Sequence, residues 1–183
     1  MKHCGTQRIE TERLVLRRFM PGDAAAMYKN WASDPEVTKY LMWPAHESVA
    51  VSEAVLQNWV KAYAEENYYQ WAIVPKENGD APIGSISVVE QDERTSMAHI
   101  GYALGRNWWH QGIMSEALKA VIDFLFDTVE ANRIEARHDP RNPHSGGVMK
   151  KCGMQYEGTH RSADWNNQGI CDAAYYAILR EER

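Results

Sequence analysis

HIGYALGRNWWHQGIMSEAL, residues 99–118, is the stretch that changes most plainly from strand to turn to helix. Apolar residues alternate within 97–105, and Gly101 and Gly105 interrupt the other side of that pattern. This is typical of a buried strand with a bulge or a close backbone approach. Gly112 then stands just ahead of a long apolar-periodic run, so unpaired backbone N–H groups and the positive end of a helix dipole converge on one point. We expect an anion to bind there.

The residues after this turn predict how the strand is built into a sheet. Apolar positions over 112–129 predict a helix that packs on a sheet. The next predicted strand, 134–137, is separated from the first by that helix, so the two strands should run parallel. A short helix is predicted over 143–151, and Gly153 is expected to close it in a left-handed conformation.

The other elements follow from alternation, helical spacing and turn residues. In chain order they are a strand over 13–19, a helix over 24–31 with Asp23 as its N-cap, a turn at 33–36, an amphipathic helix over 48–66, a hairpin of strands 69–74 and 82–89 around the turn 77–80, and a terminal hairpin of strands 154–161 and 170–180.

Composition limits the class of protein. A chain of 183 residues, 44% hydrophobic and 25% charged, is long enough for one domain with a core and short for two. No apolar run approaches the roughly 18 residues of a membrane span, and the N-terminus lacks the apolar region of a signal peptide, so we expect a cytoplasmic protein with no membrane partner. A net charge of −5 argues against a nucleic-acid partner. Three widely spaced cysteines predict reduced thiols.

Several runs together carry a family resemblance. Residues 108–117, with 139–145 and 151–154 downstream, resemble the GNAT acyltransferase superfamily, and most closely its RimJ/RimL-like branch of ribosomal-protein N-terminal acetyltransferases. Residues 10–17 and 33–37 also resemble that branch. The resemblance implies one GNAT domain over 1–183 with an α/β fold, in which a central twisted mixed sheet of six to seven strands is flanked by about four helices.

The resemblance also implies a function. The chain is expected to be an N-acetyltransferase that uses acetyl-CoA, without a metal, and transfers the acetyl group to a primary amine by direct attack in a ternary complex. His138, His144 and His160 lack the paired helical spacing of metal ligands. The expected partners are acetyl-CoA and an amine acceptor, with the protein a monomer or a homodimer.

The same resemblance assigns cofactor-binding residues. Backbone N–H groups of the turn and helix start are expected to hold the pyrophosphate, the 100–104 strand to run beside the pantetheine arm, and Asn142 to bond that arm, although it can equally cap a turn. Lys151 is a candidate for the 3′-phosphate, as is Lys150, or both form a solvated face. The cofactor-binding set is Ile100, Gln111, Gly112, Ile113, Met114, Ser115, Asn142 and Lys151. His110 and Met114 depart from the small residues usual in the family.

Three residues are candidates for the chemistry. A backbone N–H near Tyr102 is expected to polarise the thioester carbonyl. Ser145 matches a serine that protonates the departing thiolate, and its alternative role is an N-terminal helix cap. A protonated amine must lose a proton before it attacks, and His99 is the candidate base, since imidazole titrates near neutral pH. The alternative for His99 is a hydrogen-bonded core residue, and Glu116 is the second candidate base.

The acceptor is left open by the sequence. It can be the N-terminal amine of a ribosomal or other protein, or a small amine such as an antibiotic, a polyamine or an amino acid. Aromatic residues are candidates for the wall of its cleft: Tyr40, Trp43, Trp59 and Trp165. A non-catalytic acyl-CoA-binding sensor is the alternative from another class, and a different acyl donor is a further one.

Overall fold

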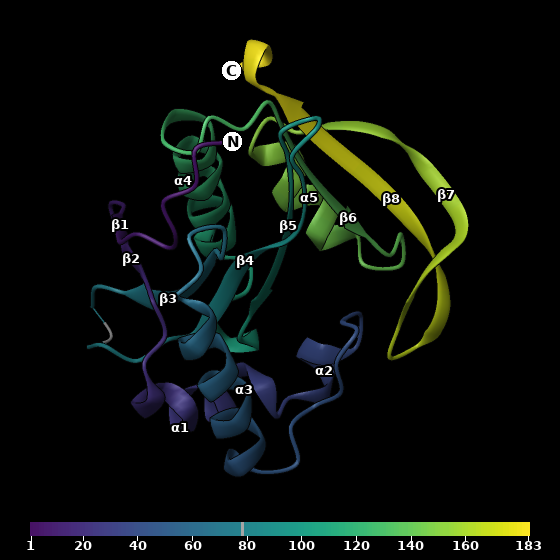
Figure 1. Cartoon of the computed structure of the whole chain (residues 1–183). Coiled ribbons are helices and arrows are strands. Elements are labelled where there is room, and N and C mark those ends of the chain that lie inside the picture. Colours follow the sequence, from purple (N-terminus) through teal and green to yellow (C-terminus); the bar gives the residue numbers. More distant parts are fainter. Residues whose placement is uncertain (78) are drawn as a thin grey trace.

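The structure, a computed structural model, describes residues 1–77 and 79–183. Within these residues eight strands form one sheet in the order β1-β2-β3-β4-β5-β6-β8-β7, as Figure 1 shows. Neighbouring strands are antiparallel except β5 and β6, which are parallel as predicted. The strands are β1 (Ile9–Glu10), β2 (Leu14–Arg17), β3 (Gln70–Pro75), β4 (Gly84–Asp92), β5 (Met97–Leu104), β6 (Arg133–His138), β7 (Gln155–Asn166) and β8 (Gly169–Leu179).

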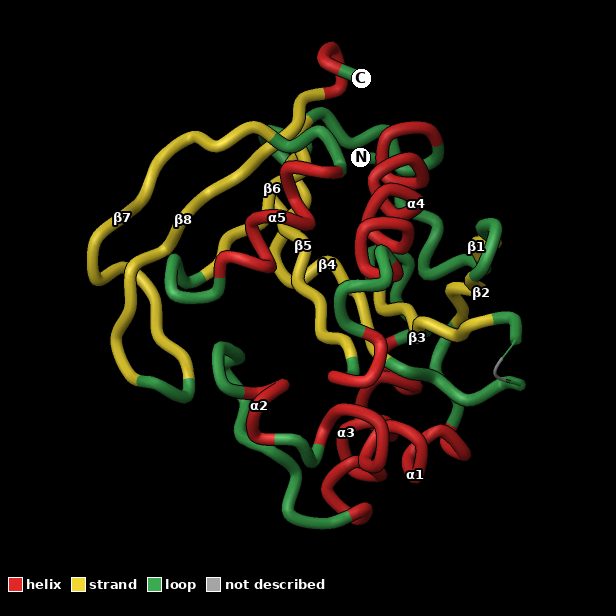
Figure 2. The backbone as a smooth tube through the Cα atoms, turned by 180° about the vertical axis from the view of Figure 1, so that it is seen from behind, coloured by secondary structure: helices red, strands yellow, loops and turns green. Residues whose placement is uncertain are grey.

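Helices cover both faces of the sheet (Figure 2). They are α1 (Ala24–Met27), α2 (Pro35–Thr38), α3 (Val49–Ala62), α4 (Ile113–Asp127) and α5 (Pro143–Lys151). The apolar face of α4 predicted from the sequence is fully buried at Ala117, Leu118, Val121 and Leu125, where it packs with one face of β3, β4 and β5. Helices α1 and α3 pack on the other face through a second cluster that contains Trp31. No described helix is long and apolar enough to cross a membrane.

The sheet is open between its two parallel strands. Strands β5 and β6 pair only over 97–99 and 133–135, whereas β5 pairs with β4 as far as Leu104. Residues 100–104 therefore present a strand edge that no residue of β6 covers. Because successive side chains on a strand point to opposite faces, His99 and Tyr102 lie on opposite sides of the sheet at this opening.

The expected fold class is confirmed, with two differences in the counts. Among the described residues there are eight strands and five helices, where six to seven strands and about four helices are predicted. The short strand β1 has two residues, too few to show alternation. Helix α2 replaces the turn predicted at 33–36: Asp34 caps it by accepting a hydrogen bond from the Glu36 N–H at 3.0 Å, and Pro35 opens it.

Three local predictions are confirmed only in part. Asp23 precedes α1 as predicted, but its carboxylate does not cap the helix; it accepts hydrogen bonds from the guanidinium of Arg17 at 2.8 and 2.9 Å. The bulge lies on β4, where the register shifts at Val89, and not on β5. The hairpin of β3 and β4 is confirmed, but the turn predicted at 77–80 includes Asn78, which lies outside the described residues.

Glycines 105 and 153 behave as predicted. A Cβ on Gly105 would lie 2.4 Å from the carbonyl oxygen of Asn30, so this position requires the close backbone approach that only glycine allows. Gly153 has φ +86° directly after α5, the left-handed conformation expected at a helix end.

The tip of the β7–β8 hairpin reaches across to α2, as Figures 1 and 2 both show. Asn167 donates its backbone N–H to the carbonyl of Leu41 at 3.1 Å and its side-chain amide to the carbonyls of Thr38 and Trp43, both at 2.8 Å. We call these three bonds the hairpin clasp. The clasp joins two parts of the chain that are more than a hundred residues apart.

Candidate active site

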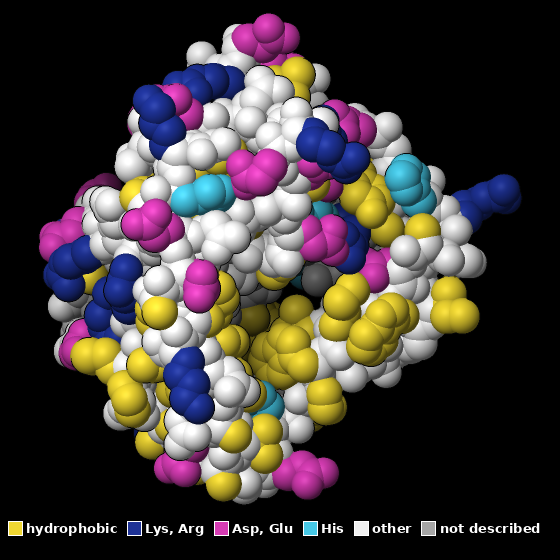
Figure 3. Space-filling model, in the orientation of Figure 1, with side chains coloured by type: hydrophobic (Ala, Val, Ile, Leu, Met, Phe, Trp, Pro, Cys, Tyr) yellow, Lys and Arg dark blue, Asp and Glu magenta, His cyan; other side chains and the backbone are white. Residues whose placement is uncertain are grey.

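A cavity of about 850 Å³ passes through the opening between β5 and β6. It is lined on one side by the starts of α4 and α5, and on the other by α2, the loop that follows it, and the β7–β8 hairpin. Figure 3 shows the cavity as a deep hollow with hydrophobic side chains around it. Of the residues proposed from the sequence, those that line it are His99, Ile100, Tyr102, Gly112, Ile113, Met114, Ser115, Asn142, Ser145 and Lys151.

The turn at Gly112 has the features of an anion site. Gly112 is the N-cap of α4 with φ +75°, and the N–H of Glu116 is bonded to its carbonyl at 3.0 Å. The amides of 113–115 precede that bond, so they lack a helical carbonyl. A Cβ on Gly112 would lie 3.5 Å from Nη2 of Arg13 and 3.7 Å from Nζ of Lys151. Two cations and the first amides of α4 therefore surround a space kept free by a missing side chain.

The two departures from small residues are both accommodated. His110 has φ +60°, a conformation that glycine adopts at little cost, and its exposed ring lies against His144 with 4.8 Å between centroids. Met114 is buried in the core cluster with α4 and also lines the cavity.

Three residues considered from the sequence lie outside the cavity lining. Gln111 is exposed, and its carbonyl accepts a hydrogen bond from Nη1 of Arg13 at 2.9 Å. Lys150 lies over the ring of Tyr176. Glu116 accepts hydrogen bonds from the hydroxyl of Thr11 and from Nε of Arg13, both at 2.6 Å. Glu116 therefore fastens α4 to the β1–β2 segment and does not line the cavity.

Tyr102 and Ser145 meet on the α5 side of the opening. Their hydroxyl oxygens are 3.0 Å apart, and the Tyr102 hydroxyl also donates to the Ser145 carbonyl at 3.1 Å. Burial raises the pKa of Tyr102 well above its ordinary value, although the hydrogen bond to Ser145 opposes this shift. Tyr102 stays protonated, and its one hydroxyl proton can go either to the Ser145 carbonyl or to the Ser145 hydroxyl. Asn142 is the N-cap of α5, but its side chain makes no capping bond, so its amide is available to the cavity.

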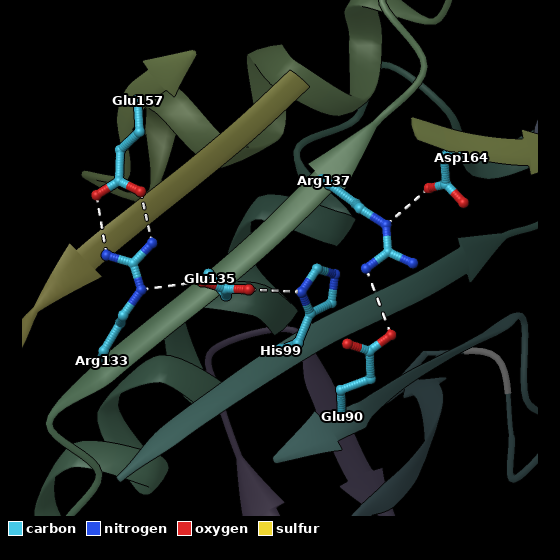
Figure 4. Close-up of polar contacts among 7 residues, drawn as sticks. All are labelled: Glu90, His99, Arg133, Glu135, Arg137, Glu157 and Asp164. Atoms are coloured by element: carbon cyan, nitrogen blue, oxygen red, sulfur yellow. Dashed lines mark hydrogen bonds and ion pairs between the residues drawn. The ribbon is translucent and has the colours of Figure 1, made fainter. Parts of the chain in front are cut away.

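On the opposite side of the sheet the cavity carries charged groups. Nδ1 of His99 lies 3.1 Å from Oε1 of Glu135. Arg137 donates to Asp164 at 2.7 Å and to Glu90 at 3.4 Å, as Figure 4 shows. Glu90 and Asp164 together outweigh the single charge of Arg137, so this part of the cavity favours a cationic group.

All four aromatic residues proposed as a cleft wall line the cavity: Tyr40, Trp43, Trp59 and Trp165. Trp165 stands on β7 next to the hairpin tip, and Trp43 accepts one bond of the hairpin clasp. The wall therefore combines aromatic residues from 40–59 with Trp165 of β7, and the hydrogen bonds of Asn167 join these two parts. Among the described residues, no group of three or more His, Cys, Asp or Glu side chains is placed to hold a metal ion.

Asp139 supports the loop before α5. Burial alone would raise its pKa, but hydrogen bonds from the side chain and backbone of Arg141 and from Asn166 outweigh burial and lower the pKa of Asp139 to about 2. The free energy that this carboxylate contributes is present above the ordinary pKa near 4 and is lost as the pH falls through 2.

Asp139→Asn is therefore expected to flatten acid unfolding. Between pH 4 and pH 2 the free energy of unfolding of the wild type should fall by about 2 kcal/mol more than that of the variant. Urea titrations at a series of pH values measure both. Parallel pH dependences for the two proteins would show that Asp139 has no such role.

Sequence reasoning did not single out Arg13, Glu90 or Glu135, which the structure places at the turn, in the cavity lining and beside His99, respectively. Arg13 comes from the far end of the chain and reaches the turn only through the sheet order. The position of Glu90 depends on the bulge in β4, which no residue pattern predicts. For Glu135 a signal was present: 133–137 reads Arg-Ile-Glu-Ala-Arg, so one face of a central strand carries three charges.

Comparisons with known proteins agree with this geometry. The family model described as an acetyltransferase (GNAT) domain matches residues 13–155. An uncharacterized N-acetyltransferase, p20 of Bacillus licheniformis, is 33% identical over 176 residues, which cover 96% of this chain and 98% of that protein. The crystal structure of a GNAT-family acetyltransferase from Bacillus anthracis matches with a TM-score of 0.83 at 26% identity, covering 96% of this chain and 99% of the other.

A third match has a bound cofactor. The structure of RimL, a ribosomal alpha-N-protein acetyltransferase in complex with coenzyme A, superposes with a TM-score of 0.84 over 97% of this chain and 100% of that chain. At 20% identity this match shows the shared fold. The family model spans most of the chain, and p20 is similar over nearly its whole length. This chain therefore belongs to the GNAT family of N-acetyltransferases.

Proposed function

We propose that this protein transfers an acetyl group from acetyl-CoA to a primary amine by direct attack in a ternary complex. The observation that carries the proposal is one continuous cavity, which joins the anion-binding turn at Gly112 to His99 through the gap between β5 and β6. A donor held on the α4–α5 side and an amine on the other side would meet at this gap.

The residues at the turn fit a coenzyme A diphosphate. The amides of 113–115 lack helical acceptors at this turn, and a Cβ on Gly112 would approach Arg13 and Lys151. Lys151 adds positive charge there, and Arg13 adds donor groups while it is paired with Glu116. The uncovered edge of 100–104 offers backbone groups to an extended amide-containing arm, with Asn142 beside it. Bound there, acetyl-CoA supplies the activated acyl group.

Two proton transfers are needed, and side chains for both line the cavity. His99 takes the proton that the ammonium form of the acceptor must lose before attack. Ser145, bonded to the protonated Tyr102, provides the proton for the departing sulfur. A backbone N–H near Tyr102 polarises the acyl carbonyl.

Two acceptor classes have support. RimL acetylates a ribosomal protein, and a shared fold makes an N-terminal α-amine a candidate acceptor for this chain. The hairpin clasp favours a small-molecule amine, because Asn167 joins the two walls of the acceptor side and so restricts the width of a substrate. The net negative charge of Glu90, Arg137 and Asp164 suits the ammonium group of either class.

Release of free CoA thiol in the presence of a panel of amines tests the proposal. The panel contains peptides with different N-terminal residues, polyamines, amino acids and aminoglycosides, and mass spectrometry identifies the acetylated product. We expect acetyl-CoA to be consumed and the product to be about 42 Da heavier than the amine, which is the mass of an acetyl group less the hydrogen that it replaces. Binding of acetyl-CoA with no thiol release from any amine would identify a sensor instead.

Ser145→Ala is expected to reduce kcat by about ten- to a hundredfold, because loss of one proton donor removes part of the general acid–base contribution. The KM for acetyl-CoA should stay within about twofold. Ser48→Ala is the matched control, since Ser48 is exposed and makes no capping bond. A kcat equal to that of the control would assign Ser145 to the helix start alone.

A further inference from the structure

A chain of ionic contacts runs from the cavity to the protein surface through three strands (Figure 4). Oε1 of Glu135 lies 3.1 Å from Nδ1 of His99, and Oε2 of the same carboxylate accepts from Nε of Arg133 at 2.9 Å. Arg133 in turn donates Nη1 to Glu157 at 2.9 Å. Both oxygens of Glu135 are thus engaged, and its orientation is fixed from two sides.

The contact with Glu135 decides which nitrogen of His99 carries hydrogen. An ionised carboxylate only accepts, so in the neutral ring Nδ1 must be the donor and Nε2 must hold the free lone pair. The hydrogen bonds from His99 and Arg133 lower the pKa of Glu135 against the opposing effect of burial, so Glu135 is ionised at neutral pH.

Nε2 is available to a substrate. His99 is 4% exposed and lines the cavity. Among the described residues Nε2 makes no hydrogen bond, while Nδ1 is bound to Glu135. In Figure 4 the second ring nitrogen is turned away from Glu135, on the side where Arg137 and Glu90 lie.

We propose that Glu135 is a positioning residue, which holds His99 in the Nδ1–H form and compensates the positive charge that the ring acquires during the reaction. Arg133 and Glu157 hold Glu135 in place. This inference rests on the proposed function, and it adds the group that makes His99 competent as a base.

Two protons leave the acceptor nitrogen during the reaction. The ammonium acceptor gives one proton to Nε2 of His99, and its nitrogen lone pair forms the C–N bond while the C–S bond breaks. Ser145 gives its hydroxyl proton to the sulfur. The second nitrogen proton is lost as the amide forms and passes through solvent to Ser145, whose hydroxyl is thereby restored. The imidazolium then releases its proton to water, so the net products are an amide, a thiol and one proton. In a site with little solvent, a carboxylate about 3 Å from the ring stabilises the imidazolium strongly.

Other charged groups also face His99, and the test must separate them. They are Glu90 on β4, Arg133 and Arg137 on β6, Glu157 and Asp164 on β7, His160 on β7 and Tyr175 on β8, whose ring lies 6.5 Å from that of His99. None of these groups is bonded to the imidazole, and within the described residues its one hydrogen-bond partner is Glu135.

The first measurement needs no substrate. Nitrogen-15 NMR of the imidazole in the resting protein reports which ring nitrogen carries hydrogen. We expect the Nδ1–H form for His99 in the wild type. A mixture or the other form is expected in Glu135→Ala and in Glu135→Gln, because a glutamine amide has one acceptor oxygen where Glu135 accepts from both His99 and Arg133. A wild-type ring with hydrogen on Nε2 overturns the inference.

The second measurement is the pH dependence of kcat/KM. Glu135→Gln removes the negative charge beside the ring and keeps the size of the side chain, so the acidic limb should move to lower pH. Loss of a hydrogen bond to a charged group predicts a fall in kcat of about ten- to a hundredfold in Glu135→Ala. Acetyl-CoA affinity should stay within about twofold. Glu53→Gln, at an exposed position on α3, is the matched control.

A Glu135→Gln profile that superimposes on the wild type overturns the inference, as does a Glu135→Ala enzyme with full kcat. Failure of the proposed function looks different: the wild type would release no thiol with any amine, and the NMR measurement would still decide the role of Glu135. Far-UV circular dichroism of both variants confirms that they are folded before kinetics are compared.

Discussion

Gly112→Glu is expected to abolish acetyl-CoA binding. Gly112 has φ +75°, where a side chain costs about 1–2 kcal/mol. A new Cβ would point between Arg13 and Lys151, and the added carboxylate would occupy the space proposed for the diphosphate. It would pair with the two cations and repel the phosphates, so the dissociation constant should rise by more than about a hundredfold.

Calorimetric titration with acetyl-CoA measures this effect. Gly22→Glu is the matched control, because a Cβ at Gly22 meets nothing within 4 Å and the residue lies before α1, away from the cavity. Gly112→Ala separates backbone strain from charge and should weaken binding by about tenfold. Wild-type affinity in Gly112→Glu would show that the diphosphate is held elsewhere.

His99→Ala is expected to lower kcat/KM by about 10²- to 10⁴-fold, the range for removal of a general base. His99 is bound to Glu135 on the acceptor side of the sheet, while the anion-binding turn lies on the other side, so acetyl-CoA affinity should be unchanged. Because the amine must then lose its proton to water, the remaining activity should rise with pH until the free amine predominates.

Thiol release recorded from about pH 6 to about pH 10 measures this change. These limits bracket the ordinary pKa values of imidazole and alkylamines. Glu90→Gln is the matched comparison, because Glu90 faces His99 across β4 and β5 and lines the same cavity. Loss of activity in Glu90→Gln with an unaltered pH profile in His99→Ala would transfer the role of base to Glu90.

The fold around β5, α4 and β6 could be predicted because each element has a clear period and the helix between the strands forces them to be parallel. Helix α5 and its closing Gly153 were also readable, since Pro143 and glycine mark its two ends. Very short elements could not be found. Strand β1 and helix α2 are formed by pairing and capping contacts, and each spans only about one period of its pattern, which is too short to show a repeat.

The spatial order of the terminal strands also could not be predicted from the sequence. Strand β8 lies between β6 and β7, and the register of β7 shifts between His160 and Asp164, so a long curved hairpin reaches α2. Hydrophobic alternation reports which side of a strand is buried and does not report which strand is its neighbour. The hairpin clasp at Asn167 therefore had no sequence signal.

The candidate site also has a part that could be predicted from the sequence and a part that could not. Residues of the turn and of α5 could be assigned because they are local, and the cavity does bring Gly112, Asn142 and Ser145 together. Contacts between distant segments decided the rest. Arg13 reaches Gly112 from β2's side of the sheet, and Glu135 reaches His99 from the parallel strand.

The proposed function requires that the first amides of α4 hold the diphosphate of acetyl-CoA at the gap between β5 and β6. Backbone amide hydrogen exchange and chemical shifts, recorded with and without acetyl-CoA, test it most directly. We predict that the amides of residues 112–115 shift and become protected on cofactor addition, together with those of 100–104, and that Gly112→Glu removes both effects. Unchanged chemical shifts and exchange rates of the amides at 112–115 in a protein saturated with acetyl-CoA would show that these amides do not hold the diphosphate.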